Sequence, residues 1–220
     1  MATDLTLVIA NKTYSSWSLR PWLAMTHFGV PFEEIVIPLN QDATSLEILK
    51  HSPAGKVPVL HHGDITVWES LAILEYLADA FYDRVWWPTD PHAKAHARTI
   101  AAEMHASFGA LRQAMPMNLR KVYPARTWAE DVTKDIDRVQ AIWRDTRHRF
   151  GQGGDFLFGD FTIADAMFAP VITRFKTYVI DMDDVCSPYA DAVLALPAMQ
   201  KWTAEAADEP WVIDKYGPPD

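Results

Sequence analysis

Residues 52–60 read SPAGKVPVL, and the proline at position 58 stands inside an apolar run with the composition of a β-strand. A proline has no N–H to donate to a neighbouring strand, so it is uncommon within a sheet. We expect the Val57–Pro58 peptide bond to be cis, because that geometry turns the strand edge outward and leaves the N–H and C=O of Val57 free for a peptide ligand. The alternative is an ordinary proline on an edge strand.

The stretches on either side of this segment alternate between strand-like and helix-like patterns. Apolar runs predict strands over residues 5–9, 32–39, 57–61 and 65–68, and helical patterns cover residues 18–28, 44–51 and 69–81. A Gly-containing turn at 62–64 joins the last two strands as a hairpin. The order β-α-β-α-β-β-α predicts an α/β domain over residues 1–82.

The second half of the chain has a different character. Residues 83–92 contain two prolines and are interpreted as a linker. Beyond it no convincing strand pattern occurs, and helices are predicted over residues 93–115, 127–150, 162–178 and, more briefly, 190–196 and 198–206. Thr127 with Glu130, and Thr162 with Asp165, each predict a capping box at a helix start. Residues 93–220 are therefore expected to form an all-helical domain.

The composition limits the kinds of partner that the chain can have. Twenty Lys and Arg against 29 Asp and Glu give a net charge of −9, which argues against nucleic-acid binding. No run approaches the roughly 20 apolar residues that cross a bilayer. The single cysteine, Cys186, excludes an internal disulfide and fits a reducing compartment. We expect a cytoplasmic protein that binds neither nucleic acid nor membrane.

Polar side chains follow the first strand, where residues 14–22 read YSSWSLRPW. The hydroxyls of Ser15 and Ser16 come at the start of a helix, where free N–H groups and the helix dipole favour an anion, including a thiolate. The alternative is that one serine only caps the helix.

Two further polar groups lie at the ends of strands in the same domain. Lys56 could meet a ligand carboxylate, or it could be solvated like most lysines. At the next strand-to-helix junction, the N–H groups around Ser70 could bind a carboxylate, and Glu69 could pair with an ammonium group. Together these groups predict a site for a small zwitterionic peptide with a carboxylate at each end.

These stretches, in this order and spacing, resemble the thioredoxin-like domain of cytosolic glutathione transferases. Residues 15–20, SSWSLR, look like the SSCxxR signature of the zeta class, which includes maleylacetoacetate isomerases, with Trp17 where that class has cysteine. SPAGKVPVL is similar to the family's NPxxxVPxL, and Glu69-Ser70 matches its (E/Q)S pair. Residues 159–165, GDFTIAD, resemble its G-x-x-x-(S/T)-x-A-D motif, so the resemblance spans nearly the whole chain.

The resemblance implies a glutathione transferase with glutathione as co-substrate, no metal and a homodimeric assembly. Ser15 would be the catalytic residue, donating a hydrogen bond that stabilises the glutathione thiolate, and the neighbouring Ser16 could bond the same sulfur. The glutathione-binding residues that we expect are Ser15, Ser16, Trp17, Lys56, Val57, Pro58, Glu69 and Ser70.

The second substrate would be a small, apolar electrophile held by the helical domain. In the resembled family the first long helix of that domain forms one wall of the co-substrate pocket. On the corresponding predicted helix of this chain, Met104, Phe108 and Leu111 occur at helical spacing. Arg174, in an Arg-Phe-Lys stretch, resembles a substrate-binding arginine of the zeta class. These four residues are the expected co-substrate pocket.

Other functions remain open at this stage. One is a glutathione-dependent cis–trans isomerase of maleylacetoacetate type, although Trp17 removes the thiol that those enzymes carry. Another is a glutathione-binding protein without catalytic activity. A thiol–disulfide reductase is disfavoured, because Ser15 and Ser16 stand where a redox pair would need cysteines.

Overall fold

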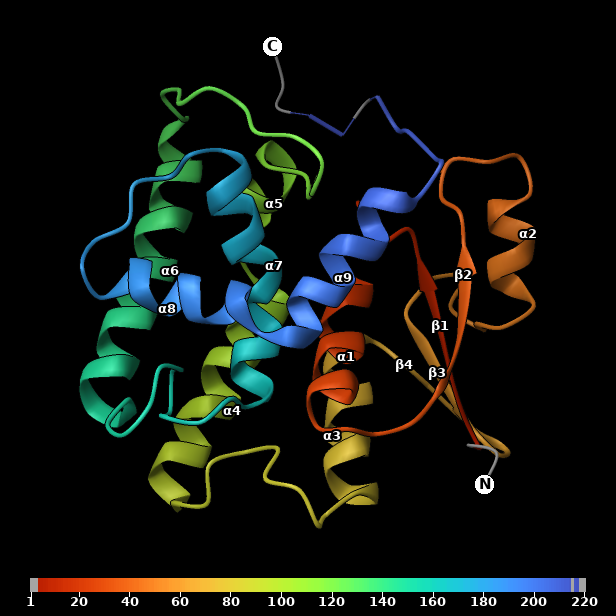
Figure 1. Ribbon diagram of the computed structural model, residues 1–220, viewed down its shortest axis with the longest axis horizontal. Coiled ribbons are helices and arrows are strands. Elements are labelled where there is room, and N and C mark those ends of the chain that lie inside the picture. The colour runs from red at the N-terminus through yellow and green to blue at the C-terminus, as the bar shows by residue number, and fades with distance from the viewer. Residues whose placement is uncertain (1–3, 215, 218–220) are drawn as a thin grey trace.

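The computed structural model describes residues 4–214, 216 and 217, and it contains an α/β half followed by a helical half (Figure 1). The first half runs β1 (Leu5–Ala10), α1 (Ser16–His27), β2 (Glu33–Ile37), α2 (Thr44–Leu49), β3 (Val59–His62), β4 (Ile65–Trp68) and α3 (Ser70–Ala80). This is the predicted βαβαββα order. The Val57–Pro58 bond is cis, as predicted.

The four strands form one mixed sheet in the order β2-β1-β3-β4. β1 pairs parallel with β2 and antiparallel with β3, which in turn pairs antiparallel with β4. Successive side chains of β1 alternate between the two faces, since Leu7 and Ile9 pack with the helices α1 and α3, whereas Val8 packs with Ile48 of α2. Helices therefore cover both faces of the sheet (Figure 1).

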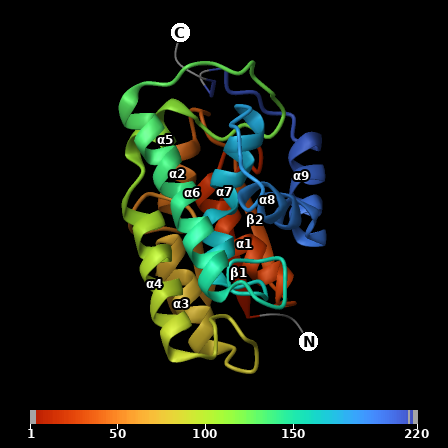
Figure 2. The ribbon, with the colours of Figure 1, turned by 90° about the vertical axis from the view of Figure 1, so that its left-hand side faces the viewer.

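The helical half contains α4 (Pro91–Ala106), α5 (Gly109–Ala114), α6 (Glu130–Phe150), α7 (Ile163–Thr177), α8 (Cys186–Ala195) and α9 (Pro197–Asp208). Nearly all of α7 is buried. It packs against α1 on one side and against α4 on the other, and Trp143 of α6 contacts its Phe168 and Phe175 rings (Figure 2). The two halves thus share one hydrophobic core along α7.

Several helix boundaries differ from the prediction, and two of these differences bear on the site. The helix expected over residues 93–115 breaks at Ser107 and Phe108, because Ser107 is extended and Phe108 takes a left-handed conformation with φ of +62°. α1 begins at Ser16, earlier than predicted, so Pro21 lies inside the helix rather than in its first turn.

The two predicted capping boxes have different outcomes. The box between Thr162 and Asp165 is present, and both residues are buried. The box between Thr127 and Glu130 is absent, because α6 begins at Glu130 itself and Ala129 is its N-cap. No helix within the described part of the chain is long and apolar enough to cross a membrane.

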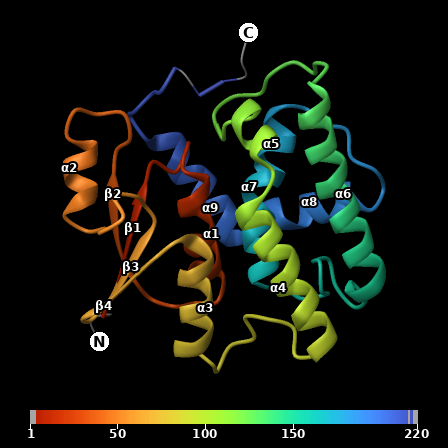
Figure 3. The same cartoon turned by 180° about the vertical axis from the view of Figure 1, so that it is seen from behind.

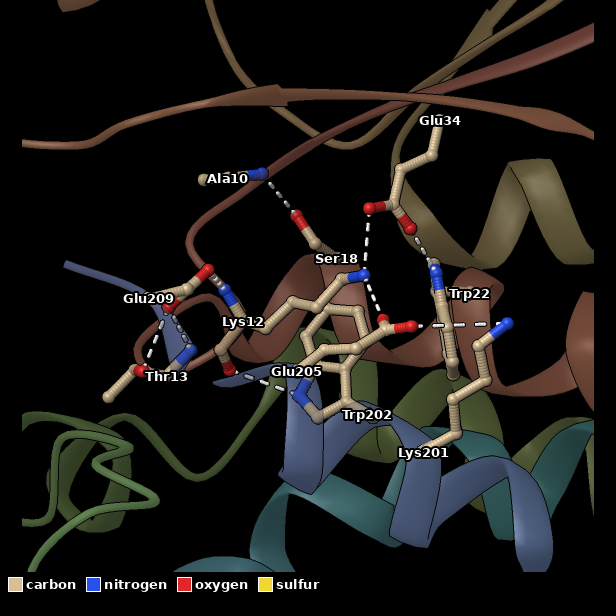
Figure 4. Close-up of polar contacts among 10 residues, drawn as sticks. All are labelled: Ala10, Lys12, Thr13, Ser18, Trp22, Glu34, Lys201, Trp202, Glu205 and Glu209. Carbon is tan, nitrogen blue, oxygen red and sulfur yellow. Dashed lines mark hydrogen bonds and ion pairs between the residues drawn. The ribbon is translucent and has the colours of Figure 1, made fainter. Parts of the chain in front are cut away.

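A buried lysine joins the sheet to the last helix (Figure 4). The Lys12 side chain lies between the carboxylates of Glu34, 2.7 Å from its ammonium, and Glu205 of α9, and over the rings of Trp22 and Trp202. A groove of about 670 Å³ runs beside this cluster. Because Lys12 and these two carboxylates pair with one another, we interpret them as holding α9 against the first domain.

Candidate functional site

Two adjoining cavities lie beside the start of α1, lined mainly by the first domain and by the segment from Arg112 to Met117. Figure 3 shows the face of the molecule on which the first domain stands beside α4 and α5. The larger, of about 500 Å³, is lined by Tyr14, Ser15, Ser16, Trp17, Leu39, Ile48, Gly55, Lys56, Val57, Arg112, Pro116, Met117, Arg174 and Tyr216. The smaller, of about 230 Å³, is lined by Trp17, Lys56, Val57, Pro58, Trp68, Glu69 and Ser70. The cavities share three residues and form one continuous groove. Every residue expected to bind glutathione lines one or both of them.

Ser15 ends the loop that leads from β1 into α1. Its N–H donates to the Asn11 carbonyl at 2.9 Å, and its hydroxyl bonds the Ser18 hydroxyl at 2.7 Å. Ser18 Oγ also accepts the Ala10 N–H at 3.2 Å. Although Ser15 is the N-cap residue of α1, its side chain makes no capping bond. Its hydroxyl is instead tied through Ser18 to the end of β1.

Ser16, the first residue of α1, has a different partner. Its Oγ accepts a hydrogen bond of 3.1 Å from Nη2 of Arg174, which comes from α7. Arg174 is only 4% exposed, and its Nε and Nη1 donate to the carbonyls of Met115 and Pro170. Burial lowers the pKa of Arg174 to about 10, so the guanidinium still carries its charge at neutral pH.

Trp17 lines both cavities, and its ring lies against two guanidinium groups. Its ring centre is 4.2 Å from the Arg20 guanidinium carbon and 5.3 Å from that of Arg112, distances that permit cation–π attraction. Arg20 is almost fully buried and donates to Met167 O at 3.2 Å and to Ser70 Oγ at 3.5 Å. Burial lowers the pKa of Arg20, and the charges of Arg174 and Arg112 lower it further.

The smaller cavity ends at the junction of β4 and α3. Glu69 has φ of +66° and ψ of 123°, a conformation that a residue with a side chain holds only where its surroundings fix it. Its carboxylate is exposed and lies 3.6 Å from Nε2 of His105. Ser70 follows as the first residue of α3, whose opening turn leaves N–H groups without helical partners. A carboxylate and these donors therefore stand side by side.

The expected co-substrate residues fall into two groups. Arg174 lines the larger cavity, but Met104, Phe108 and Leu111 are buried in the hydrophobic core and do not line it. The segment that follows the break at Phe108 supplies other residues to the cavity wall: Arg112, Pro116 and Met117. The helical spacing of residues 104–115 could not predict these lining residues, because the prediction treated the whole stretch as one unbroken helix.

Tyr216 also lines the larger cavity, and no motif pointed to it. The chain returns to the site after α9, where the Ile213 N–H donates to the Tyr14 hydroxyl at 3.1 Å. The Tyr14 and Tyr216 rings lie 5.0 Å apart. Tyr216 thus closes one side of the cavity.

Groups that could support other chemistry are few in residues 4–214, 216 and 217. No cluster of three or more His, Cys, Asp or Glu in that part of the chain could hold a metal ion. Cys186 is buried at the start of α8, and burial raises the pKa of its thiol to about 12. A thiol of that pKa is protonated at neutral pH and is a poor nucleophile.

Comparisons with known proteins agree with this arrangement. Family profiles match the glutathione S-transferase N-terminal domain over residues 14–80 and the C-terminal domain over residues 94–205. A maleylacetoacetate isomerase of Rattus norvegicus is 28% identical over 199 residues, which cover 86% of this chain and 87% of that protein. Glutathione S-transferase 1 of Dianthus caryophyllus is 38% identical over 176 residues, covering 76% and 77%. A crystal structure of a glutathione transferase homologue from Burkholderia with bound glutathione has the same fold, with a TM-score of 0.70 at 22% identity over 93% of this chain and 98% of that one.

Proposed function

This chain belongs to the glutathione S-transferase family, and on that premise we propose that it binds glutathione in the groove, stabilises its thiolate and transfers it to a small electrophile. With an aryl halide, the sulfur forms a bond to the ring carbon and the halide leaves with the electron pair of the broken bond. The carrying observation is that the two cavities bring the residues expected to bind glutathione into one groove.

The γ-glutamyl end of glutathione fits the smaller cavity by charge. Its ammonium would face Glu69, and its carboxylate would face Ser70 and the N–H groups at the start of α3. The positive charge of Arg20, 3.5 Å behind the Ser70 hydroxyl, favours a carboxylate at this place. Lys56 lines both cavities and could meet the other carboxylate.

The rest of the peptide would lie along the segment that precedes β3, which contains Val57 and Pro58 and lies outside the strand. The cysteinyl backbone would pair with Val57, which the cis bond to Pro58 leaves at the groove wall. This pairing directs the sulfur toward the start of α1, where Ser15 and Ser16 lie. A serine hydrogen bond to the sulfur stabilises the thiolate and raises its population near neutral pH.

The domain limits and assembly follow from the same proposal. Residues 1–82 would bind glutathione, 83–92 would link the halves, and 93–220 would contribute the co-substrate side.

A homodimer is supported by apolar side chains on β4, the edge strand of the sheet, where Ile65 is 49% and Trp68 42% exposed. A cytoplasmic role in detoxification fits this chemistry. Sedimentation at micromolar concentration tests the dimer, and a species near 25 kDa would contradict it.

A second candidate is glutathione-dependent isomerisation of a substrate with carboxylates. Arg112 and Arg174 line the larger cavity, and neither forms an ion pair with a carboxylate of the described residues. The thiolate would add to a double bond, the resulting single bond would rotate, and expulsion of the same thiolate would restore the double bond. The relative from Rattus norvegicus has the name of such an isomerase.

Binding and turnover together test the proposal. We expect calorimetry to detect glutathione binding that Glu69→Ala weakens, and the Glu130→Ala variant, on an exposed turn of α6, to bind like the wild type. Turnover of an aryl halide would identify a transferase, and turnover of maleylacetoacetate an isomerase. Glutathione binding without either turnover would favour a binding protein, and absence of binding would contradict the proposal.

A further inference from the structure

The turn that leads from β1 into α1 leaves two of its own N–H groups without a main-chain partner. The N–H groups of Tyr14 and Ser15 both donate to the Asn11 carbonyl, at 3.2 and 2.9 Å, and Ser15 is the N-cap of α1. Within the described part of the chain, the N–H groups of Lys12 and Thr13 have no main-chain acceptor. These five residues, the entry turn, are all buried, and a buried N–H group needs a partner.

The missing partner is a carboxylate from the other end of the chain (Figure 4). One oxygen of Glu209 accepts the Lys12 N–H at 2.5 Å. The other oxygen accepts the Thr13 N–H at 3.0 Å and lies 2.8 Å from the Thr13 hydroxyl. Successive N–H groups in a turn form a concave site for an anion, and here the anion is the Glu209 side chain. A residue that follows α9, 197 positions along the chain from Lys12, therefore completes a turn of the first domain.

Glu209 is itself held in place through its main chain. Its carbonyl accepts a hydrogen bond from the guanidinium of Arg120. The same guanidinium donates to the carbonyls of Ala206 at 2.9 Å and Trp211 at 3.2 Å. A cation that bonds the last carbonyls of a helix stabilises the helix end. Arg120 thus fixes the end of α9, and Glu209 with it.

A second carboxylate of α9 contacts the entry turn in a different way. Glu205 pairs with the side-chain ammonium of Lys12, which also lies 2.7 Å from Glu34. This ion pair joins α9 to the first domain, but it does not bond the main chain of the turn. The two carboxylates therefore separate two roles: Glu205 docks the helix, whereas Glu209 also holds the backbone of the turn.

We propose that Glu209 is a positioning residue of the thiolate site: its carboxylate fixes the entry turn and thereby sets where the hydroxyls of Ser15 and Ser16 stand in the groove. The turn ends at Ser15, and Ser16 begins α1, so a shift of the main chain at Thr13 displaces both hydroxyls relative to the glutathione sulfur. Glu209 lines neither cavity of the groove, so it acts only through the turn. This inference rests on the proposed function, because it needs glutathione in the groove.

The pKa of the bound glutathione thiol reports how well the serine hydroxyls are placed. Ultraviolet absorbance of the thiolate, followed against pH at saturating glutathione, measures it in the wild type, Glu209→Ala and Glu209→Gln. We expect Glu209→Ala to raise this pKa by about 1 unit and to slow conjugation of an aryl halide about tenfold near neutral pH. The carboxamide of glutamine keeps one acceptor oxygen, so Glu209→Gln should give a smaller rise. Glutathione affinity should stay nearly unchanged in both variants, because Glu69 and Ser70 hold the γ-glutamyl end.

Glu205→Gln is the matched control for a purely structural role. It removes the ion pair between α9 and Lys12 but leaves the contacts of Glu209, so we expect a lower free energy of unfolding with the wild-type thiol pKa. An unchanged thiol pKa in Glu209→Ala, or an equal rise in Glu205→Gln, would overturn the inference. If Glu209→Ala does not fold, the nearly isosteric Glu209→Gln decides in its place. Failure of the wild type to bind glutathione in calorimetry would refute the proposed function itself, whereas binding with no pKa change in the Glu209 variants would refute only this inference.

Discussion

The starts of α1 and α7 are both built from short polar side chains, but they use them differently. At α7 the Asp165 carboxylate accepts the Thr162 N–H at 2.8 Å, the Thr162 hydroxyl at 3.0 Å and the Leu157 N–H at 3.0 Å. Thr162 is 2% exposed, and Asp165 is fully buried. The donors and the carboxylate satisfy one another inside the protein.

At α1 the polar groups are left for a ligand. Ser15 is the N-cap residue but makes no capping bond, and the Ser16 hydroxyl accepts from Arg174 at the wall of a cavity. A helix start needs partners for its unpaired N–H groups, and a ligand can supply them as well as a side chain can. Polar groups at a helix start that already bond one another, as at α7, therefore indicate a role in folding. Polar groups at a helix start that line a cavity, as at α1, indicate a binding site.

Removal of the Asp165 carboxylate should have the largest effect. Asp165→Ala leaves three buried donors without their acceptor, so we expect the free energy of unfolding to fall by about 2–4 kcal/mol in urea denaturation. The folded fraction should bind glutathione with nearly unchanged affinity, because Asp165 does not line the groove. Weaker binding with an unaltered denaturation midpoint would mean that the start of α7 is part of the site.

Removal of a hydroxyl at α1 should affect rate more than stability. Ser15→Ala should slow conjugation of an aryl halide about ten- to a hundredfold near neutral pH, since the thiolate loses a charge-assisted hydrogen bond. The rate should recover as the pH rises, because more glutathione is then ionised without help. Steady-state kinetics against pH measure this, with Thr127→Ala, an exposed position outside the groove, as the control. A slower rate at every pH would point to lost positioning instead of lost ionisation.

A histidine beside the groove should make glutathione binding depend on pH. Burial lowers the pKa of His105 from 6.5, Arg20 lowers it further, Glu69 raises it, and Arg112 lowers it. His105 is therefore neutral near pH 7 and gains a proton only as the pH falls below about 6.5. The new cation then competes with the glutathione ammonium for Glu69, so the dissociation constant should increase severalfold upon acidification. Calorimetry across this range should show a flatter profile in His105→Gln, and equal profiles would exclude His105 as the cause.

The smallest effect is expected at a capping pattern that the structure does not use. Thr127→Ala should change the free energy of unfolding by less than about 0.5 kcal/mol, since Thr127 is exposed and lies outside α6. Thr162→Ala, the same change at the box that does form, should cost about 1–2 kcal/mol. Equal losses of unfolding free energy in Thr127→Ala and Thr162→Ala would show that the capping box at α7 does not stabilise the protein.

The comparisons of α1 with α7 and of Thr127 with Thr162 also show which features the sequence could predict. Strand and helix order follows from apolar periodicity, which is a local property, and the βαβαββα order was predicted correctly. The T-x-x-D/E pattern occurs at Thr127 and at Thr162, but a capping box forms only at Thr162. The difference depends on where each helix begins and on burial, which the pattern alone does not give. The left-handed conformation of Phe108 divides the predicted helix next to Gly109, and a single glycine inside a helical pattern is too weak a signal to predict that break.

The site was predictable where its residues are neighbours in the chain. Ser15, Ser16, Glu69 and Ser70 belong to short motifs at strand-to-helix junctions, and the fold gathers these junctions at one edge. Arg112 and Tyr216 enter the same cavity from distant segments, and only tertiary packing brings them there. The partners of the two serine hydroxyls could not be predicted together either, since Ser15 bonds the nearby Ser18, whereas Ser16 bonds Arg174, 158 residues along the chain.

The position of the glutathione sulfur tests the central claim most directly. A crystal structure of the wild-type protein with bound glutathione should place the sulfur within hydrogen-bonding distance of a serine hydroxyl at the start of α1, Ser15 or Ser16, with the γ-glutamyl end beside Glu69 and Ser70. A sulfur out of hydrogen-bonding reach of both serine hydroxyls would contradict the account. So would glutathione bound outside the groove between α1 and α3.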